Sequence, residues 1–280
     1  MDLPAGCVYL VPVPIGNLGD ITLRALETLK KVDLIACEDT RNTGFLLSQY
    51  EINPPRLISL HKYNERKRSS EILGSLLAGH DVAVVSDAGS PGISDPALLF
   101  IQSAIEAGIQ IVPLPGATAL IPALIASGLD TSLWQFCGFA PLKVKDRRAF
   151  LEQIKDYPGS SVLYESPHRI RQSLEDLLAA CGDRQVCIGR EISKLHEEFI
   201  RGTLSAIVED YQIKEKGEFV VVVGAAQKEC KPDPDEVAGH IDSLLAEGRS
   251  MKSVAESVAE RFSLARNTAY QIVLQRKKEL

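Results

Sequence analysis

DVAVVSDAGSPGISDP, residues 81–96, decides the fold of this chain. Its first part, residues 81–86, is a short apolar run rich in valine, the pattern of a strand that is buried on both faces. A loop rich in glycine and proline follows, and residues 96–107 then form an apolar run with the length of a helix. A buried strand, a loop and a helix in this order form the repeating unit of an α/β domain.

The same alternation continues on both sides of this segment. Apolar runs predict strands at residues 7–13, 32–37 and 109–114. Residues 22–31 and 65–78 have helical spacing of their apolar positions and predict helices between these strands. We therefore expect a mainly parallel sheet that is covered by helices on both faces.

A second α/β unit follows the first. Its strands are expected at residues 133–139, 161–164, 186–188, 198–201 and 219–223, and its helices at residues 147–154 and 170–180. The predicted fold class is therefore α/β, with one domain over residues 1–115 and a second over residues 116–226.

The C-terminal part of the chain has a different character. Residues 227–235, QKECKPDPD, are polar with two prolines and predict a linker. Three short helices are expected beyond it, at residues 236–246, 251–262 and 267–277 of a module that spans residues 233–280. Their pattern resembles a helix-turn-helix. Basic residues such as Arg266 and Arg276 favour RNA contact by this module, and the alternative is a helical cap with a solvated charged face.

The amino-acid composition limits the classes of protein to which this chain can belong. The chain has 280 residues, of which 45% are hydrophobic and 24% charged, the balance of a folded protein rather than a disordered one. Its formal net charge of −6 excludes a globally basic surface, so that a polyanion has to bind a local patch. The six cysteines include no CxxC pair and no Cys/His cluster with metal-ligand spacing, which predicts buried free thiols in a reducing compartment and no metal site.

Membrane insertion and secretion are not expected. The N-terminus lacks a basic stretch followed by an apolar one, the pattern of a signal peptide. Residues 107–129 carry no charge, but prolines and glycines interrupt them, so that a strand, a turn and a buried helix fit better than a membrane span. The expected location is cytoplasmic.

Several common nucleotide-binding and hydrolase motifs are missing. The first strand does not end in GxGxxG, and the chain contains no GxxxxGK[ST], GxSxG or HExxH. Loops rich in glycine and proline instead follow three predicted strands, at residues 14–19, 86–96 and 113–120. Each of them alone is most often an ordinary turn. Because ligands bind at the carboxyl edge of open α/β sheets, three such loops at one edge predict a binding site.

Seven motifs along the chain carry a family resemblance. They are VPVPIGNLGDIT (11–22), ACEDTRNTG (36–44), SDAGSPGISDP (86–96), PLPGATAL (113–120), FCGFAP (136–141), LYESPHRI (163–170) and GREISKLHEEFIRG (189–202). Together they resemble the tetrapyrrole methylase family, whose fold is two α/β domains with the methyl donor in the cleft between them. The resemblance implies S-adenosylmethionine as the cofactor and a homodimer.

One departure from the family pattern bears on the substrate. Family members usually carry Gly-Asp-Pro in the second loop, where this chain has Gly89-Ser90-Pro91. The change argues against a tetrapyrrole substrate and agrees with the branch that modifies RNA. That branch implies 2′-O-methylation of a cytidine of 16S rRNA, in the decoding centre of the 30S subunit. A methyltransferase of a small molecule, such as a tetrapyrrole precursor, and a non-enzymatic nucleic-acid-binding regulator are the alternatives.

The resemblance also implies cofactor contacts on both domains. Carried over by position, they are Ile15, Gly16, Asp87, Gly89, Ser90, Ile93, Thr118, Ala119, Phe139, Leu163 and Ala225.

A ribose hydroxyl is a poor nucleophile, so a general base is expected near the cofactor loops. Two polar motifs at strand ends supply catalytic candidates, namely Glu38, Asp39 and Arg41 in the first and Glu165 and His168 in the second. The alternative role for Glu38 and Asp39 is helix capping. The alternative for His168 is a place in the turn at the start of a helix. If the first motif acts in catalysis, replacing Glu38 or Asp39 by alanine abolishes transfer and leaves cofactor affinity intact.

Two further clusters are candidates for other roles. A basic segment with an aromatic residue could hold RNA phosphates, and its members are His61, Lys62, Tyr63, Asn64 and Arg66. The alternative is a solvated helix start. Arg190, Glu191 and Lys194 could reach the cleft or form a buried ion pair.

Overall fold

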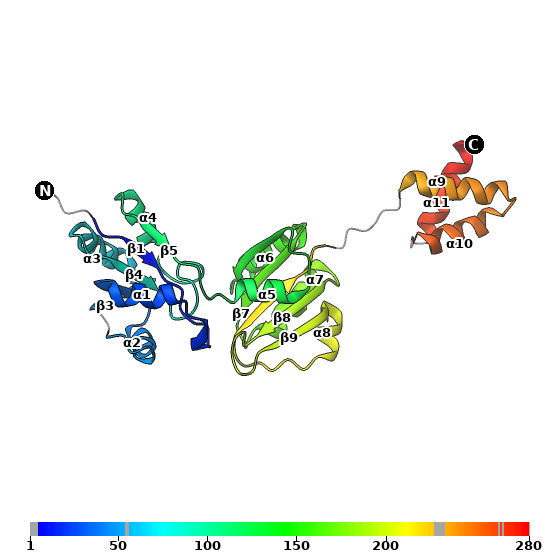
Figure 1. The fold of residues 1–280 in the computed structure, drawn as a ribbon. Coiled ribbons are helices and arrows are strands. Elements are labelled where there is room, and N and C mark those ends of the chain that lie inside the picture. Colours follow the sequence, from blue (N-terminus) through cyan, green and yellow to red (C-terminus); the bar gives the residue numbers. More distant parts are fainter. Residues whose placement is uncertain (1–4, 54–55, 227–232, 263, 265, 280) are drawn as a thin grey trace. The chain divides into compact units, whose positions relative to one another are not determined.

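A computed structural model describes residues 5–53, 56–226, 233–262, 264 and 266–279. The chain divides into two compact units, residues 1–226 and residues 227–280 (Figure 1). The first contains both predicted α/β domains, and the second contains the predicted helical module.

The first sheet is entirely parallel, as predicted. Its strands are β1 (Val8–Leu10), β2 (Leu34–Cys37), β3 (Arg56–Ser59), β4 (Val82–Val85) and β5 (Ile111–Pro113), in the order β3-β2-β4-β1-β5. Strand β3 was not predicted, because it is a four-residue edge strand in which only Ile58 is fully buried. The decisive strand β4 lies at the centre of the sheet, and all four of its residues are buried.

Helices cover both faces of this sheet. They are α1 (Leu23–Lys31), α2 (Thr40–Gln49), α3 (Glu65–Leu77) and α4 (Leu98–Glu106), and a 3₁₀ turn η1 (Leu18–Asp20) precedes α1. Leu29 of α1 and Leu47 of α2 pack on one face, whereas Ile72 of α3 and Phe100 of α4 pack on the other. Because strand side chains alternate between faces, β4 contributes Val84 to one core and Val85 to the other.

The second sheet is mixed rather than parallel. Its strands are β6 (Trp134–Phe139), β7 (Ser160–Glu165), β8 (Gln185–Arg190), β9 (Glu198–Thr203) and β10 (Phe219–Val223), in the order β6-β7-β10-β8-β9. Only β6 and β7 are parallel, whereas β10 runs antiparallel to both of its neighbours. Strand β9, predicted at residues 198–201, lies at one edge of this sheet.

The helices of this second domain are α5 (Leu120–Ser127), α6 (Val144–Asp156), α7 (Ile170–Cys181) and α8 (Leu204–Asp210). Helix α5 packs on one face of the sheet, and the other three pack on the opposite face. Helix α8, only seven residues long, was not predicted. The uncharged stretch 107–129 forms β5, a loop and α5, as expected. Across the part of the chain that the structure describes, no helix is long and apolar enough to cross a membrane.

The second unit is a bundle of three short helices, as predicted. They are α9 (Pro234–Ala246), α10 (Met251–Arg261) and α11 (Arg266–Glu279). Val237, Ile241 and Val254 belong to a core that is separate from those of the two sheets. The predicted linker, residues 227–235, lies mostly outside the described residues; of its last residues, Asp233 caps α9.

The cysteines agree with the prediction of free thiols, although only two of them are fully buried. Cys37 and Cys187 are buried, whereas Cys7, Cys137 and Cys181 are partly exposed, and all five are free. Cys230 lies outside the described residues. Among the residues described, no group of three or more His, Cys, Asp or Glu side chains could hold a metal ion.

Candidate functional site

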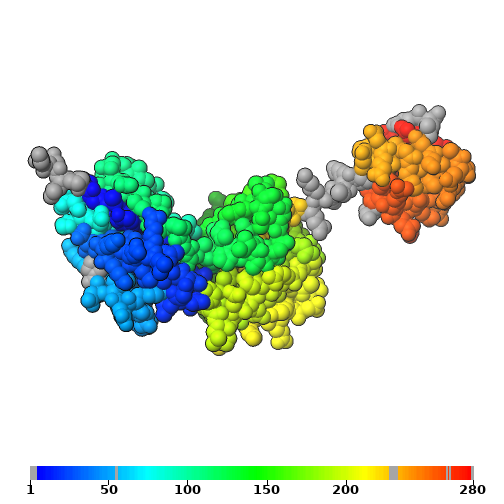
Figure 2. All heavy atoms as spheres, viewed as in Figure 1, coloured from blue at the N-terminus to red at the C-terminus, as the bar shows by residue number. Residues whose placement is uncertain are grey.

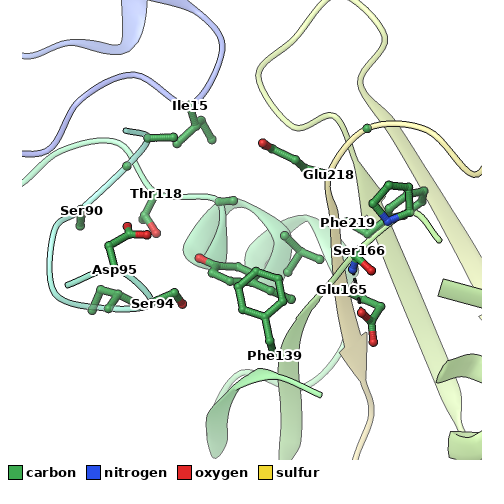
Figure 3. A pocket seen from close by; sticks show the side chains of 18 residues that line it. Ile15, Ser90, Ser94, Asp95, Thr118, Phe139, Glu165, Ser166, Glu218 and Phe219 are labelled. Carbon is green, nitrogen blue, oxygen red and sulfur yellow. Dashed lines mark hydrogen bonds between the residues drawn. The ribbon is translucent and has the colours of Figure 1, made fainter. Parts of the chain in front are cut away.

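A pocket of about 350 Å³ lies in the first unit and is lined by residues of both α/β domains. Its volume falls in the range of small-molecule and cofactor sites. The lining residues are Ile15, Ala88, Gly89, Ser90, Ile93, Ser94, Asp95, Thr118, Ala119, Phe139, Tyr164, Glu165, Ser166, Pro167, Gly217, Glu218, Phe219 and Val220. Figure 3 shows Ser94 and Asp95 on one side, Glu165, Ser166 and Phe219 on the other, and Phe139 between them.

The three glycine- and proline-rich loops converge on this pocket. Val13 and Gly89 exchange two backbone hydrogen bonds of 2.9 Å, which join the first loop to the second. The Ser90 hydroxyl donates to the carbonyl of Ala117 at 3.2 Å, which joins the second loop to the third. Gly89 has a φ of +75°, and a Cβ there would lie 3.3 Å from Ile15. Glycine is therefore required for this close packing of the loops.

Most of the predicted cofactor contacts line the pocket. They are Ile15, Gly89, Ser90, Ile93, Thr118, Ala119 and Phe139.

Two of the predicted contacts on the second domain, Leu163 and Ala225, do not line the pocket. Leu163 is buried in the core beneath α6 and α7, and the next residue, Tyr164, lines the pocket instead, because strand side chains alternate. Ala225 follows the carboxyl end of β10, whereas the pocket lies at the amino end of that strand, at Gly217 and Phe219. The family resemblance implied Ala225, but β10 is antiparallel to β7, so its carboxyl end lies away from the pocket.

Asp87 supports the pocket loops from outside the pocket lining. Its carboxylate accepts hydrogen bonds from the backbone N–H of Asp39, at 3.1 Å, and from the side-chain amide of Asn42, at 2.8 Å. These bonds tie the loop after β4 to the start of α2. The arrangement indicates a role in holding the loop rather than direct contact with a ligand.

Gly16 also lies outside the pocket lining, and it takes part in a contact between the two domains. A Cβ on Gly16 would lie 2.4 Å from Cγ of Lys194, so that the lysine stem rests directly on the glycine backbone. Nearby, the Ser193 hydroxyl hydrogen-bonds the Asp20 carboxylate. In the space-filling view, the blue N-terminal part touches the yellow-green part of the second domain (Figure 2).

Lys194 is held by carboxylates on its own domain. Its Nζ lies 2.9 Å from Oε1 of Glu191 and 3.1 Å from Oε2 of Glu218, a residue of the pocket lining. Burial alone would raise the pKa of Glu191, but hydrogen bonds from Lys194 and from the backbone of Glu218 outweigh it and lower this pKa. We call Gly16, Glu191, Lys194, Gly217 and Glu218 the interdomain latch.

Backbone geometry shows how tightly the latch is built. Glu191 and Ser193 have φ values of +51° and +69°, in the left-handed region that non-glycine residues seldom occupy. Gly217 has a φ of +92°, and a Cβ there would lie 2.5 Å from the Glu191 carboxylate. Such strain persists where the surrounding structure holds it in place, often at functional sites. The side chains of this region form ion pairs, Arg190 with Glu198 and Lys194 with Glu191. These pairs agree with the alternative from the sequence, in which the charged residues pair with one another.

Asp39 is the N-cap of α2. Its carboxylate accepts from the backbone N–H of Arg41 at 2.8 Å and pairs with the guanidinium of that residue at 2.6 Å. Hydrogen bonds from Arg41 lower the pKa of Asp39 to about 2. The Arg41 side chain is 89% exposed. Asp39 therefore has the capping role that the sequence left open, and a carboxylate this acidic is a poor proton acceptor.

Glu38 has a different environment from its neighbour. Burial and the negative charges of Asp95 and Asp87 raise its pKa, whereas His61 acts in the opposite direction. Asp95 lines the pocket, and its own pKa is raised by burial and by Asp87. Sequence reasoning placed Asp95 inside a loop motif without giving it a role. Glu38 therefore has a raised pKa and lies near Asp95 of the pocket lining, which fits the general base that the sequence predicts.

Glu165 is fully engaged within the second domain, although it lines the pocket. It pairs with Arg169 at 2.7 Å and accepts hydrogen bonds from Ser173 and the backbone of Ser166. These contacts fix the turn before α7. His168 is exposed in the same turn and does not line the pocket. The structure thus supports a structural role for Glu165. It gives no support to a catalytic role for His168, which is exposed outside the pocket lining.

The predicted RNA-binding segment forms the turn before α3. Asn64 stabilises this turn, because its side chain accepts from the N–H of His61 and donates to the carbonyl of Ser59. Tyr63 is 85% exposed, with the Lys62 ammonium 4.9 Å from its ring centre. Arg66 is also exposed. The segment therefore presents cations and one ring to solvent, and Asn64 is a structural residue within it.

The basic residues predicted on the helical module differ in their environment. Arg276 of α11 pairs with Asp242 of α9 at 2.7 Å, which holds the two helices together. Arg266, at the start of α11, is exposed. In the described part of the chain, Arg266 is therefore exposed and makes no ion pair with another helix, unlike Arg276.

Two α/β domains of this topology with a shared pocket define a class of proteins, and comparisons identify it. A model of the tetrapyrrole (corrin/porphyrin) methylases matches residues 7–208. The chain therefore belongs to the tetrapyrrole methylase family. This confirms the family and the fold class expected from the sequence.

The chain is also similar over nearly its whole length to curated proteins. "Ribosomal RNA small subunit methyltransferase I" of Synechocystis sp. is 44% identical over 274 residues, covering 96% of this chain and 98% of that protein. The protein of the same name from Escherichia coli O157:H7 is 41% identical over 280 residues, covering 99% of this chain and 97% of that protein. Both of these relatives therefore extend through the C-terminal module.

Solved structures share the fold at lower identity. Uroporphyrin-III C-methyltransferase from Thermus thermophilus is 19% identical, with a TM-score of 0.54 over 78% of this chain and 94% of that chain. A structure of that enzyme complexed with S-adenyl homocysteine has the same identity and TM-score and covers 97% of that chain. At this identity the likeness shows the fold alone.

Proposed function

We propose that this chain transfers a methyl group from S-adenosylmethionine to the 2′-hydroxyl of a cytidine in 16S rRNA of the small ribosomal subunit. The observation that carries the proposal is the pocket in which the family's loop motifs converge. The names of the most similar relatives support rRNA of the small subunit as the substrate. The nucleotide and the ribose position come from the sequence resemblance.

The pocket suits a cofactor with an adenosine and a charged end. Ile15, Ile93 and Phe139 offer apolar surface, and the Thr118 and Ser90 hydroxyls offer polar contacts. When bound there, S-adenosylmethionine supplies a methyl group that its sulfonium has already activated. The protein then mainly has to align the reacting atoms and exclude water, and alignment alone can contribute about 7–11 kcal/mol.

Glu38 is the proposed general base. It follows β2 at the same edge of the sheet as the loops that line the pocket, and its raised pKa makes it a better proton acceptor than Asp39. Proton removal by a positioned base contributes about 10²–10⁴-fold to such a reaction. The Lys62–Arg66 turn and the C-terminal module are proposed to hold phosphates of the RNA.

A homodimer is also proposed. The outer face of α4 supports it, because Leu98, Leu99 and Ile105 are exposed there. Exposed apolar side chains gathered on one helix mark an interaction surface more often than scattered ones do. Light scattering coupled to gel filtration tests this, and a monomer at micromolar concentration would contradict it.

The decisive test is transfer of tritium from labelled S-adenosylmethionine to 30S subunits that lack the modification. Nucleoside mapping of the labelled RNA should yield a 2′-O-methylcytidine at a single site. Label in another nucleoside, or on a base, would contradict the proposed position. Label in a tetrapyrrole precursor but none in 30S would favour the small-molecule alternative. A chain that binds no S-adenosylmethionine in titration would favour the regulator.

A further inference from the structure

The segment PLKVKDRR, residues 141–148, has an unusual surface. It connects β6 to α6 and forms the first turn of that helix. Leu142 and Val144 are 81% and 84% exposed, the cations Lys143 and Lys145 alternate with them along the chain, and Arg148 is exposed one helical turn further on. Single exposed apolar residues are common, but two beside three cations form a compact amphipathic patch.

This patch lies at the rim of the pocket. Strand β6 ends at Phe139, which lines the pocket, and the patch begins two residues later. The carbonyl of Ala140 accepts a hydrogen bond of 2.9 Å from Arg169, and Arg169 in turn pairs with Glu165 of the pocket lining. The patch is therefore anchored to the second-domain wall of the pocket.

The cations of the patch contribute little to the fold. Arg147 is the exception, because it pairs with Asp176 and so joins α6 to α7. Within the residues described, Lys143, Lys145 and Arg148 have no ion pair in the structure. Lys143 is the N-cap of α6 without a side-chain capping bond, and positive charges near a helix N-terminus are electrostatically unfavourable. Such cations are available to an anionic partner.

We propose that residues 141–148 form an RNA-contacting surface at the second-domain rim of the pocket, an inference that rests on the proposed function. Lys143, Lys145 and Arg148 contact phosphates, and Leu142 and Val144 pack against an unstacked nucleotide next to the target. Two properties of RNA favour it as the occupant. Its backbone is a polyanion that a chain of net charge −6 can bind only through local patches, and its single-stranded segments expose bases for apolar contact.

The test compares two charge reversals of equal size. Lys143→Glu/Lys145→Glu alters the patch, and Lys30→Glu/Lys31→Glu alters the last turn of α1. Helix α1 follows the first pocket loop and runs back along the sheet, so that its end lies at the opposite edge from the pocket. Glutamates at the start of α6 suit the helix dipole, so the first variant should not lose stability.

Binding to 30S subunits is measured for both variants at several salt concentrations, with S-adenosylhomocysteine present so that no turnover occurs. We expect the patch variant to bind at least about tenfold more weakly at low salt and to show a salt slope reduced by about 1.4–1.8, as for two lost phosphate contacts. Affinity for S-adenosylhomocysteine and the melting temperature should stay unchanged. The α1 variant should bind 30S like the wild type. Equal losses in both variants, or none in the patch variant, would overturn the inference.

A second variant tests the apolar part. Leu142→Ser/Val144→Ser should weaken 30S binding without changing the salt slope, because these side chains release no counterions. Unchanged affinity in this variant would remove Leu142 and Val144 from the surface. Wild-type protein run in the tritium assay separates the two proposals. If it does not methylate or bind 30S, the proposed function fails. If it does and the patch variant matches it, only this inference fails.

Discussion

At the scale of single residues, Glu38 and Asp39 show how position within a turn sets acidity. Asp39 is the N-cap of α2, and hydrogen bonds from Arg41 lower its pKa to about 2. Glu38, one residue earlier, is partly buried near Asp87 and Asp95, and its pKa is raised. Identical chemical groups thus acquire opposite tendencies, one to stay ionised and one to bind a proton.

A first prediction concerns Glu38. Glu38→Gln should lower kcat for methyl transfer by about 10²–10⁴-fold, because the amide cannot take the hydroxyl proton. Donor affinity, measured by calorimetry, should not change. Because a base must be deprotonated to act, wild-type activity should fall as the pH decreases through the raised pKa of Glu38, above the ordinary value of 4.5. A glutamine variant that keeps this acid limb or its activity would exclude Glu38 as the base.

A second prediction concerns Asp39. Asp39→Ala removes the cap of α2 and should lower the melting temperature at neutral pH while leaving most of kcat. Asn is also a good cap, so Asp39→Asn is the matched control and should be more stable than the alanine variant. The pKa of Asp39 is depressed in the fold, so its stabilising effect is present above pH 3.8 and is lost as the pH falls toward 2. Loss of transfer in a folded Asp39→Asn variant would restore Asp39 as the base.

At the scale of elements, the start of α4 depends on a distant side chain. The N-cap of α4, Ala97, gives no side-chain bond, and the buried Glu65 of α3 accepts from the N–H groups of Leu99 and Phe100, at 2.9 and 3.2 Å. This carboxylate therefore caps α4 from a neighbouring helix. Because α4 follows the loop 86–96 directly, Glu65 also holds that pocket loop in place.

A third prediction follows for Glu65. Glu65→Ala leaves two helix N–H groups without their acceptor and should destabilise the protein by about 1–3 kcal/mol. Glu65→Gln keeps one acceptor oxygen and should lose less. Glu71→Ala is the control on the same helix, because it removes only partly exposed ion pairs with Arg56 and Arg68. Urea unfolding measures the three variants, and equal losses for Glu65→Ala and Glu71→Ala would contradict the cap.

A fourth prediction concerns the interdomain latch. Lys194→Met keeps the stem that rests on Gly16 but removes the charge that binds Glu191 and Glu218. Since the pair is partly exposed, we expect a moderate weakening of S-adenosylmethionine binding, about 3- to 10-fold in Kd. Lys155→Met, which removes a surface pair with Glu152, should bind like the wild type. An unchanged Kd in Lys194→Met would show that the latch does not shape the pocket.

Much of the fold could be predicted from local patterns, but strand direction could not. Apolar runs identified β4 and β10 because both are buried along their whole length. Nothing in FVVVV states which way the strand runs, however, and the antiparallel direction of β10 is what places Ala225 away from the pocket. The sequence also does not state which face of a strand each side chain takes, and the structure places Tyr164, rather than Leu163, in the pocket lining.

In the candidate site, too, local features could be predicted from the sequence and contacts between distant segments could not. Loops such as 86–96 were predictable, because glycine and proline mark turns at strand ends. The cap by Glu65 and the contact of the latch with Gly16 were not, because they depend on segments far apart in sequence: Glu65 with Leu99, and Gly16 with Lys194. Only the folded chain shows which polar residues of a motif face the pocket and which hold its walls.

At the scale of the whole molecule, two units with separate cores share one chain. The core of the second unit includes Ile241, Val254 and Val273, which come from all three of its helices. All the residues that line the pocket belong to the first unit. The second unit's contribution to RNA binding can therefore be tested apart from donor binding.

A fifth prediction uses this division. A chain ending at residue 232 should fold cooperatively and bind S-adenosylmethionine with an unchanged Kd, because the pocket and its supporting cores remain whole. Its affinity for 30S subunits should fall, since the exposed cations of the module, Arg266 among them, are lost. The full-length Arg266→Glu variant is the control that alters charge without removing the module, and it should show a smaller loss in the same direction. Equal 30S affinity of the truncated and the complete chain would show that the module does not contact the RNA, and the RNA would then have to be held by the first unit alone.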